Sequence, residues 1–254
     1  MRFGTGLLAL RAGEGRVVAL LAGLFATVEA GRGLGEVAAD TLFISRFGAD
    51  ALPYLYIGLG MVSMIVALTY GAAIGRFDRR RLLAGLLIGF GLIMLVERAA
   101  VLTGAPAVLA VVWVSVYVIG AMLLTVLWTV AGSTLDARQA KRLFPICTSA
   151  AIIGGFAGTL AAGPLARLLG TESLLVVFAV LLVGAAALVT STVGRSGAPI
   201  ARPVRPPSLI SELRVGFDNV RRSPMMRLVA AAYVLFAVLL FSLSFPFLRV
   251  MGDS

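Results

Sequence analysis

The chain has 254 residues, of which 60% are hydrophobic and 13% are charged, and its mean hydropathy is +1.02. A soluble domain of this length cannot hide so much apolar surface, so the composition places the chain among multi-span membrane proteins. Histidine is absent and Cys147 is the only cysteine. This excludes Ser-His-Asp and Cys-His nucleophiles, imidazole or thiolate metal sites and an internal disulfide, so we expect no catalytic residues, no metal and no cofactor.

The formal net charge of +10 would fit a nucleic-acid-binding protein by its value alone. The basic residues, however, cluster beside the apolar spans, which is the pattern of a protein at an anionic membrane surface. The expected partner is therefore the lipid bilayer and not nucleic acid.

Hydropathy and helix breakers predict an all-α, polytopic fold. The seven predicted spans are residues 17–46, 51–75, 82–102, 107–134, 144–169, 173–193 and 224–250.

The basic residues lie mostly on one side of these spans. By the positive-inside rule, the N-terminus and the loops that follow even-numbered spans are cytoplasmic, as in the inner membrane of a bacterium. The opposite loops are short and carry few charges. The basic residues outside the cytoplasmic segments are Arg32, Arg46, Arg98, Arg167 and Arg249.

The first span carries four ionisable residues, Glu29, Arg32, Glu36 and Asp40, at spacings of three, four and four. At about 100° per residue they fall within an arc of roughly 80°, so they share one face of the helix. A charge at the bilayer centre costs on the order of 2.5 to 3.5 kcal/mol even on the lenient insertion scale, so this face should turn toward protein or water. The row predicts a substrate or coupling site in which Arg32 pairs with an anion.

A structural interpretation of the same row is an intrahelical ladder. Arg32 lies three residues after Glu29 and four before Glu36, spacings that suit ion pairs joining this helix to its neighbours. The functional interpretation is favoured, because the ladder leaves acidic charge over.

The loop after the second span resembles the signature of the major facilitator superfamily, with glycines, an acidic residue and a basic run in the first cytoplasmic hairpin. In that family these groups brace the cytoplasmic gate. A tight turn flanked by positive-inside arginines is the alternative. The gating candidates are Gly71, Gly75, Asp78, Arg79, Arg80 and Arg81.

Two other spans carry candidate features. In the fourth span Trp113, Tyr117 and Trp128 lie within roughly 60° of one another, a stripe on which an aromatic substrate could stack. We expect both tryptophans to belong to the interfacial belt, which leaves Tyr117 as the cavity candidate. At the outer end of the third span, Glu97 and Arg98 should extend toward the interface.

In the fifth span the small residues Gly154, Gly155 and Gly158 stand in two ladders that allow close helix packing. Packing is their expected role, with helix bending during gating as an addition.

Four stretches together resemble the bacterial relatives of the ATP/ADP translocases. They are ADTLFISRFGADALPYLY at 39–56, WTVAGSTLDARQAKRLFP at 128–145, GGFAG at 154–158 and LGTESLL at 169–175. The resemblance implies a twelve-span facilitator fold that exchanges nucleotides. One departure is that its relatives use lysines at membrane depth, whereas the single lysine here, Lys141, falls in a predicted cytoplasmic loop.

The expected organisation is a six-span transporter half at 1–193, a Pro-rich basic linker with an amphipathic interfacial helix at 194–223, and the first span of a second half at 224–254. We therefore expect a fragment whose missing C-terminal half completes the cavity. The predicted function is secondary transport of an anionic small molecule, such as a nucleotide. A non-transporting sensor or scaffold with a soluble domain is the alternative, and a membrane enzyme is a third.

Overall fold

The computed structural model describes residues 14–74, 78–193, 217–218 and 221–252. Within these ranges there are helices and no strand, which confirms the all-α fold class. The helices are α1 Gly15–Phe47, α2 Leu52–Ile74, α3 Arg79–Val101, α4 Pro106–Thr134, α5 Ala137–Leu169, α6 Leu174–Val193 and α8 Pro224–Gly252, with the 3-10 turns η1 Ala49–Ala51 and η2 Thr171–Ser173.

Six helices of the described chain, α1 to α6, are long and apolar enough to cross a membrane, which confirms a multi-pass membrane protein. In α8 the apolar segment among the described residues is shorter, Pro224–Phe236. The seventh span therefore stays a prediction.

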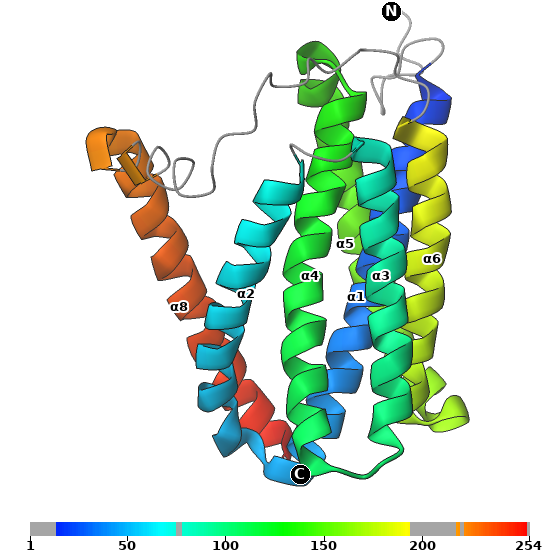
Figure 1. Cartoon of the computed structure of the whole chain (residues 1–254), viewed down its shortest axis with the longest axis vertical. Helices are drawn as coiled ribbons and strands as arrows, with labels where there is room; N and C mark the ends of the chain where they lie inside the picture. Colours follow the sequence, from blue (N-terminus) through cyan, green and yellow to red (C-terminus); the bar gives the residue numbers. More distant parts are fainter. Residues whose placement is uncertain (1–13, 75–77, 194–216, 219–220, 253–254) are drawn as a thin grey trace, which may run out of the picture. The chain divides into compact units, whose positions relative to one another are not determined.

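The chain divides into two compact units. The first consists of Met1–Phe43 and Phe77–Pro199, and so contains most of α1 together with α3, α4, α5 and α6. Figure 1 shows these helices running side by side along the long axis. The second unit, Ile44–Arg76 and Ile200–Ser254, contains η1 with α2 and α8, both of which contact η1.

Carboxylate caps fix where two helices of the first unit begin. Asp78 caps α3 by accepting a hydrogen bond of 3.0 Å from the backbone N–H of Arg81. Asp136 and Gln139 form a reciprocal capping box at the start of α5. Because of this box α5 begins at Ala137 and not at the predicted residue 144, so Lys141 lies in the helix and not in a loop.

Two of the short loops turn at glycines with positive φ. Gly48 has φ 72° after α1, and Gly170 has φ 87° after α5. Both donate their backbone N–H to a carbonyl four residues earlier, which closes the last helical turn. Glycine suits these positions because the left-handed region is strained for residues with a Cβ.

The helix α1 makes its closest contacts with α5. A Cβ added at Gly154 would lie 2.2 Å from the carbonyl oxygen of Ala26, and one at Gly158 would lie 2.1 Å from that of Ala30. The two backbones thus meet without intervening side chains, as small-residue ladders permit. A Cβ added at Gly155, one residue along, would lie 3.9 Å from Glu29, which is an ordinary contact distance.

On another side, α1 receives an aromatic ring from α6. Phe178 is fully buried, and a Cβ at Gly31 or Gly35 would come within 2.7 or 2.6 Å of its ring. In contrast, α5 exposes apolar side chains, among them Ile152 and Phe156, as suits contact with lipid acyl chains.

Several sequence predictions fall outside the described residues. These are the basic N-terminal segment, Gly75 of the hairpin motif, the Pro-rich linker and most of the amphipathic helix expected near residues 208–222.

Candidate functional site

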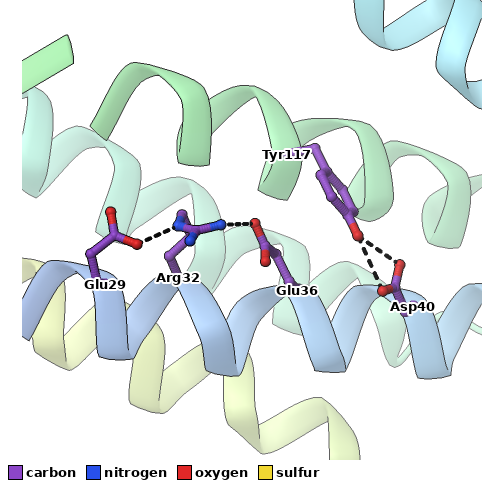
Figure 2. A network of polar contacts seen from close by, with 5 residues as sticks. All are labelled: Glu29, Arg32, Glu36, Asp40 and Tyr117. Carbon is purple, nitrogen blue, oxygen red and sulfur yellow. Dashed lines mark hydrogen bonds and ion pairs between the residues drawn. The ribbon is translucent and has the colours of Figure 1, made fainter. Parts of the chain in front are cut away.

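Arg32 joins two acidic residues of α1 through ion pairs. Arg32 donates from Nε to Oε2 of Glu29 at 2.7 Å and from Nη1 to Oε1 of Glu36 at 2.5 Å. Figure 2 shows the three side chains reaching toward one another along α1, with Asp40 one turn beyond Glu36. The four side chains therefore share one face of α1. Glu29, Arg32 and Glu36 form one connected group, whereas Asp40 bonds to residues of α4.

This row is partly enclosed by protein. The exposed fraction of the side chain is 8% for Glu29, 34% for Arg32 and 27% for Glu36. A Cβ at Gly120 of α4 would lie 3.3 Å from Cδ of Arg32, so the glycine makes room for the arginine stem. The backbone of α4 thus forms one wall beside the guanidinium.

Asp40 is held by aromatic donors from α4. Trp113 donates from Nε1 to Oδ1 at 2.8 Å, and the hydroxyl of Tyr117 lies 3.1 Å from both carboxylate oxygens. The expectation that Trp113 is a membrane-belt residue is wrong, because its ring is fully buried between α1 and α4. Its ring centroid is 4.3 Å from that of Tyr117, with the ring planes tilted by 33°, so the two aromatic donors also contact each other.

Trp128, near the other end of α4, is 37% exposed. Its ring packs edge-on against Phe25 of α1 and Phe144 of α5, with centroids 5.4 and 5.1 Å away. It does not meet Tyr117 in a single aromatic platform. The predicted belt role of Trp128 stays a prediction.

The hairpin motif has one described role, the Asp78 cap on α3. Gly71 belongs to α2 and lies in the other unit, and Arg79, Arg80 and Arg81 form the first turn of α3. The gating role of this motif, Arg79 included, stays a prediction.

The sequence analysis missed Glu97. We expected it to extend toward the interface with Arg98. Instead Glu97 is buried, and its Oε1 is hydrogen-bonded to the hydroxyl of Ser115 on α4. Arg98 instead pairs with Glu172 of η2, with Nη1 and Oε2 3.0 Å apart. The expectation is therefore wrong for Glu97, whereas for Arg98 it stays a prediction; adjacent residues of a helix point about 100° apart. Only the apolar run around Glu97 could have signalled its burial.

A second contact that was missed lies where α1 and α5 begin. Oε1 of Glu14 is 2.8 Å from Nη2 of Arg142 and 3.4 Å from Nε2 of Gln139. Glu14, the residue preceding α1, is thus bonded to the first two turns of α5. Sequence spacing does not reveal a contact between segments so far apart in the chain.

Among the described residues no group of three or more His, Cys, Asp or Glu side chains could hold a metal ion. The α1 row contains three carboxylates and one guanidinium, so it is acidic when all are ionised. Such a row can hold protons, and it can admit an anion at Arg32 when carboxylates are neutralised.

No protein-family model, no curated protein and no solved structure matches the chain.

Proposed function

We propose that the chain is part of a secondary active transporter of the major facilitator type, which moves a small organic anion across the bacterial inner membrane. The observation that supports this most is the row Glu29, Arg32, Glu36 and Asp40, which lies on one face of a membrane-spanning helix. Ionisable side chains at such depth are expensive and mark substrate or ion pathways in membrane proteins.

Arg32 is the proposed anion-binding residue. A guanidinium carries five N–H donors, and the bonds from Arg32 to Glu29 and Glu36 use one at Nε and one at Nη1. About a third of the side chain is exposed, so further donors can be reached without dismantling the row. A phosphate or carboxylate suits the planar fork of such donors.

The acidic neighbours make this site sensitive to protons. With every group ionised, three carboxylates outweigh one guanidinium, and an incoming anion is repelled. Protonation of Glu36 or Asp40 removes part of that repulsion, so anion binding should tighten as the pH falls. The carboxylates are thus the proposed carriers of coupling protons.

Binding to the purified full chain tests this proposal. ATP, ADP and simpler phosphate or carboxylate anions should raise the melting temperature of the parent protein, more so at lower pH. Arg32→Gln should abolish the shift, and Arg32→Lys should weaken it, because lysine keeps the charge but loses the fork.

Arg167→Gln is the matched control, because Arg167 is an exposed arginine near the end of α5. It should respond to anions as the parent does. If folded Arg32→Gln protein responds as the parent does, the substrate role of Arg32 is wrong.

A non-transporting sensor or scaffold is the second candidate. The observation that favours it is that Arg32 already has two carboxylate partners, as a purely structural ladder requires. If no anion stabilises the parent protein at any pH, this candidate replaces the transporter.

The proposed orientation places the N-terminus in the cytoplasm. Single cysteines at Arg80 and Gly104, in a Cys147→Ala background, should react with impermeant reagents from the inside and the outside respectively. The native Cys147 is buried, so its replacement removes a thiol that is already shielded. The reverse labelling pattern would contradict the proposed orientation.

The proposed cargo follows the resemblance to the ATP/ADP translocases, which makes a nucleotide the first anion to test. In this proposal the cavity is completed by a second half of the same fold, since facilitator sites lie between two halves.

A further inference from the structure

Glu97 is the buried carboxyl group that the proposed anion site does not use. It lies in the last two turns of α3, four residues before Val101, and is 7% exposed. Its Oε1 is hydrogen-bonded to Oγ of Ser115 on α4. Its other oxygen, Oε2, is buried and has no hydrogen-bond partner among the described residues.

The charged groups near Glu97 are engaged elsewhere. α4, α6 and η2 pack against α3. The sequences of α4 and α6 contain no charged residue. Arg98, the next residue of α3, pairs with Glu172 of η2.

The titratable side chain on α4 is Tyr117, which bonds to Asp40 of α1. An ionised Glu97 would therefore be a buried carboxylate without a cationic partner in the described chain, and a charge in that condition is strongly disfavoured.

The hydrogens available at Ser115 point the same way. Its hydroxyl has one hydrogen, yet Oγ lies 2.8 Å from the carbonyl oxygen of Val111 and 3.1 Å from that of Val112, in addition to Glu97. If Glu97 carries a proton on Oε1, it donates to Oγ, and the serine hydrogen is free for Val111. If Glu97 is ionised, its Oε1 has to accept the hydrogen bond from the Ser115 hydroxyl, and the hydroxyl can then no longer donate to the Val111 carbonyl oxygen.

We propose that Glu97 and Ser115 form a proton-binding site, in which Glu97 holds a proton as a neutral carboxylic acid at neutral pH. The proton is exchanged with water when the contact between α3 and α4 opens: the O–H bond of Glu97 breaks, and the proton passes to water. The site is separate from the α1 row, so it does not depend on the anion proposal.

Infrared spectroscopy of the purified full chain tests this without any ligand. At neutral pH the parent should show carbonyl absorption of a protonated carboxyl group that is lost in Glu97→Gln. Glu172→Gln is the matched control, since Glu172 is half-exposed and paired with Arg98, and it should leave that absorption unchanged. If Glu97→Gln instead removes carboxylate absorption, the proposal is overturned.

A second variant covers the case in which Glu97→Gln does not fold. Ser115→Ala removes the acceptor of the Glu97 proton and should shift the acid carbonyl band toward that of a free acid. An unchanged acid region in folded Ser115→Ala protein would overturn the proposal. The pH dependence of melting gives an independent readout.

A group protonated in the folded protein but ionised after unfolding contributes stability that is lost as the pH rises. The melting temperature of the parent should therefore fall more steeply than that of Glu97→Gln between mildly acidic and mildly alkaline pH. Equal slopes would contradict a proton held at Glu97.

Discussion

The helix α1 meets its neighbours through two different kinds of surface. Toward α5 it offers backbone, with the carbonyls of Ala26 and Ala30 against Gly154 and Gly158. Toward α4 it offers charged side chains, with Arg32 beside Gly120 and Asp40 bonded to aromatic donors. At Gly154 and Gly158 the first surface has no room for even a methyl group, whereas the second carries the ion pairs within α1 and the hydrogen bonds from Asp40 to α4.

The difference bears on where the protein can change. A backbone contact has one close-packed arrangement, so it can hold two helices together but cannot exchange partners. An ion pair or a charge-assisted hydrogen bond can pass from one partner to another, such as a substrate or a proton, at a similar energy. We therefore expect fixed architecture on the α5 side of α1 and any rearrangement on its α4 side.

The largest effect is expected from filling the backbone contact. In Gly158→Ala the new Cβ would lie 2.1 Å from the Ala30 carbonyl oxygen, so α1 and α5 must separate. Overpacking typically costs about 1 to 3 kcal/mol and occasionally more, and because the clashing atoms are backbone we expect a cost at the top of that range or above it. Thermal melting in detergent should show a large fall in melting temperature or a loss of folded protein.

Gly163→Ala provides the control in the same helix, because nothing lies within 4 Å of a Cβ at that position. Both variants gain the same helix propensity, up to about 1 kcal/mol. The control should therefore melt at or above the parent temperature. If Gly158→Ala melts like Gly163→Ala, the close α1–α5 contact is absent from the protein in solution.

An intermediate effect is expected in the charged row. Arg32→Gln leaves Glu29 and Glu36 without their cation. Breaking a fully buried pair costs about 3 to 5 kcal/mol. Because Arg32 and Glu36 are partly exposed, we expect a destabilisation well below that range and smaller than that of Gly158→Ala, measured by denaturation of the purified protein.

A double-mutant cycle separates the ion pair from general damage. Arg32→Gln and Glu36→Gln combined should destabilise less than the sum of the two single variants, because each single variant leaves an uncompensated partner. Strict additivity would mean that Arg32 and Glu36 do not interact in the folded protein.

The sequence predicted much of this architecture, because length and hydropathy decide which segments span a bilayer. The helical period also placed the α1 row on one face. Two features of the structure were not predicted from the sequence. The burial of Trp113 and Glu97 depends on partners from other helices, Asp40 and Ser115, which no local pattern identifies.

The start of α5 escaped for another reason. A hydropathy profile does not detect the polar first turns of a helix that extends beyond the membrane. The start of α5 is marked instead by polar residues, those of the Asp136 capping box. The transport role and the cargo remain predictions, since they depend on which ligand meets Arg32.

The smallest effect is expected at the far end of the charged surface. Tyr117→Phe removes one of the two aromatic donors to Asp40, while the Trp113 bond remains. A single hydrogen bond contributes about 0.5 to 1.5 kcal/mol, so the free energy of unfolding should fall by that amount. Tyr54→Phe, at an exposed tyrosine, should have almost no effect.

In an Asp40→Asn background the loss of stability caused by Tyr117→Phe should shrink, because the acceptor is no longer charged. An equal loss in both backgrounds would show that the Tyr117 hydroxyl stabilises the protein through some group other than Asp40. The contact between α1 and α4 would then not depend on the hydrogen bond from Tyr117 to Asp40.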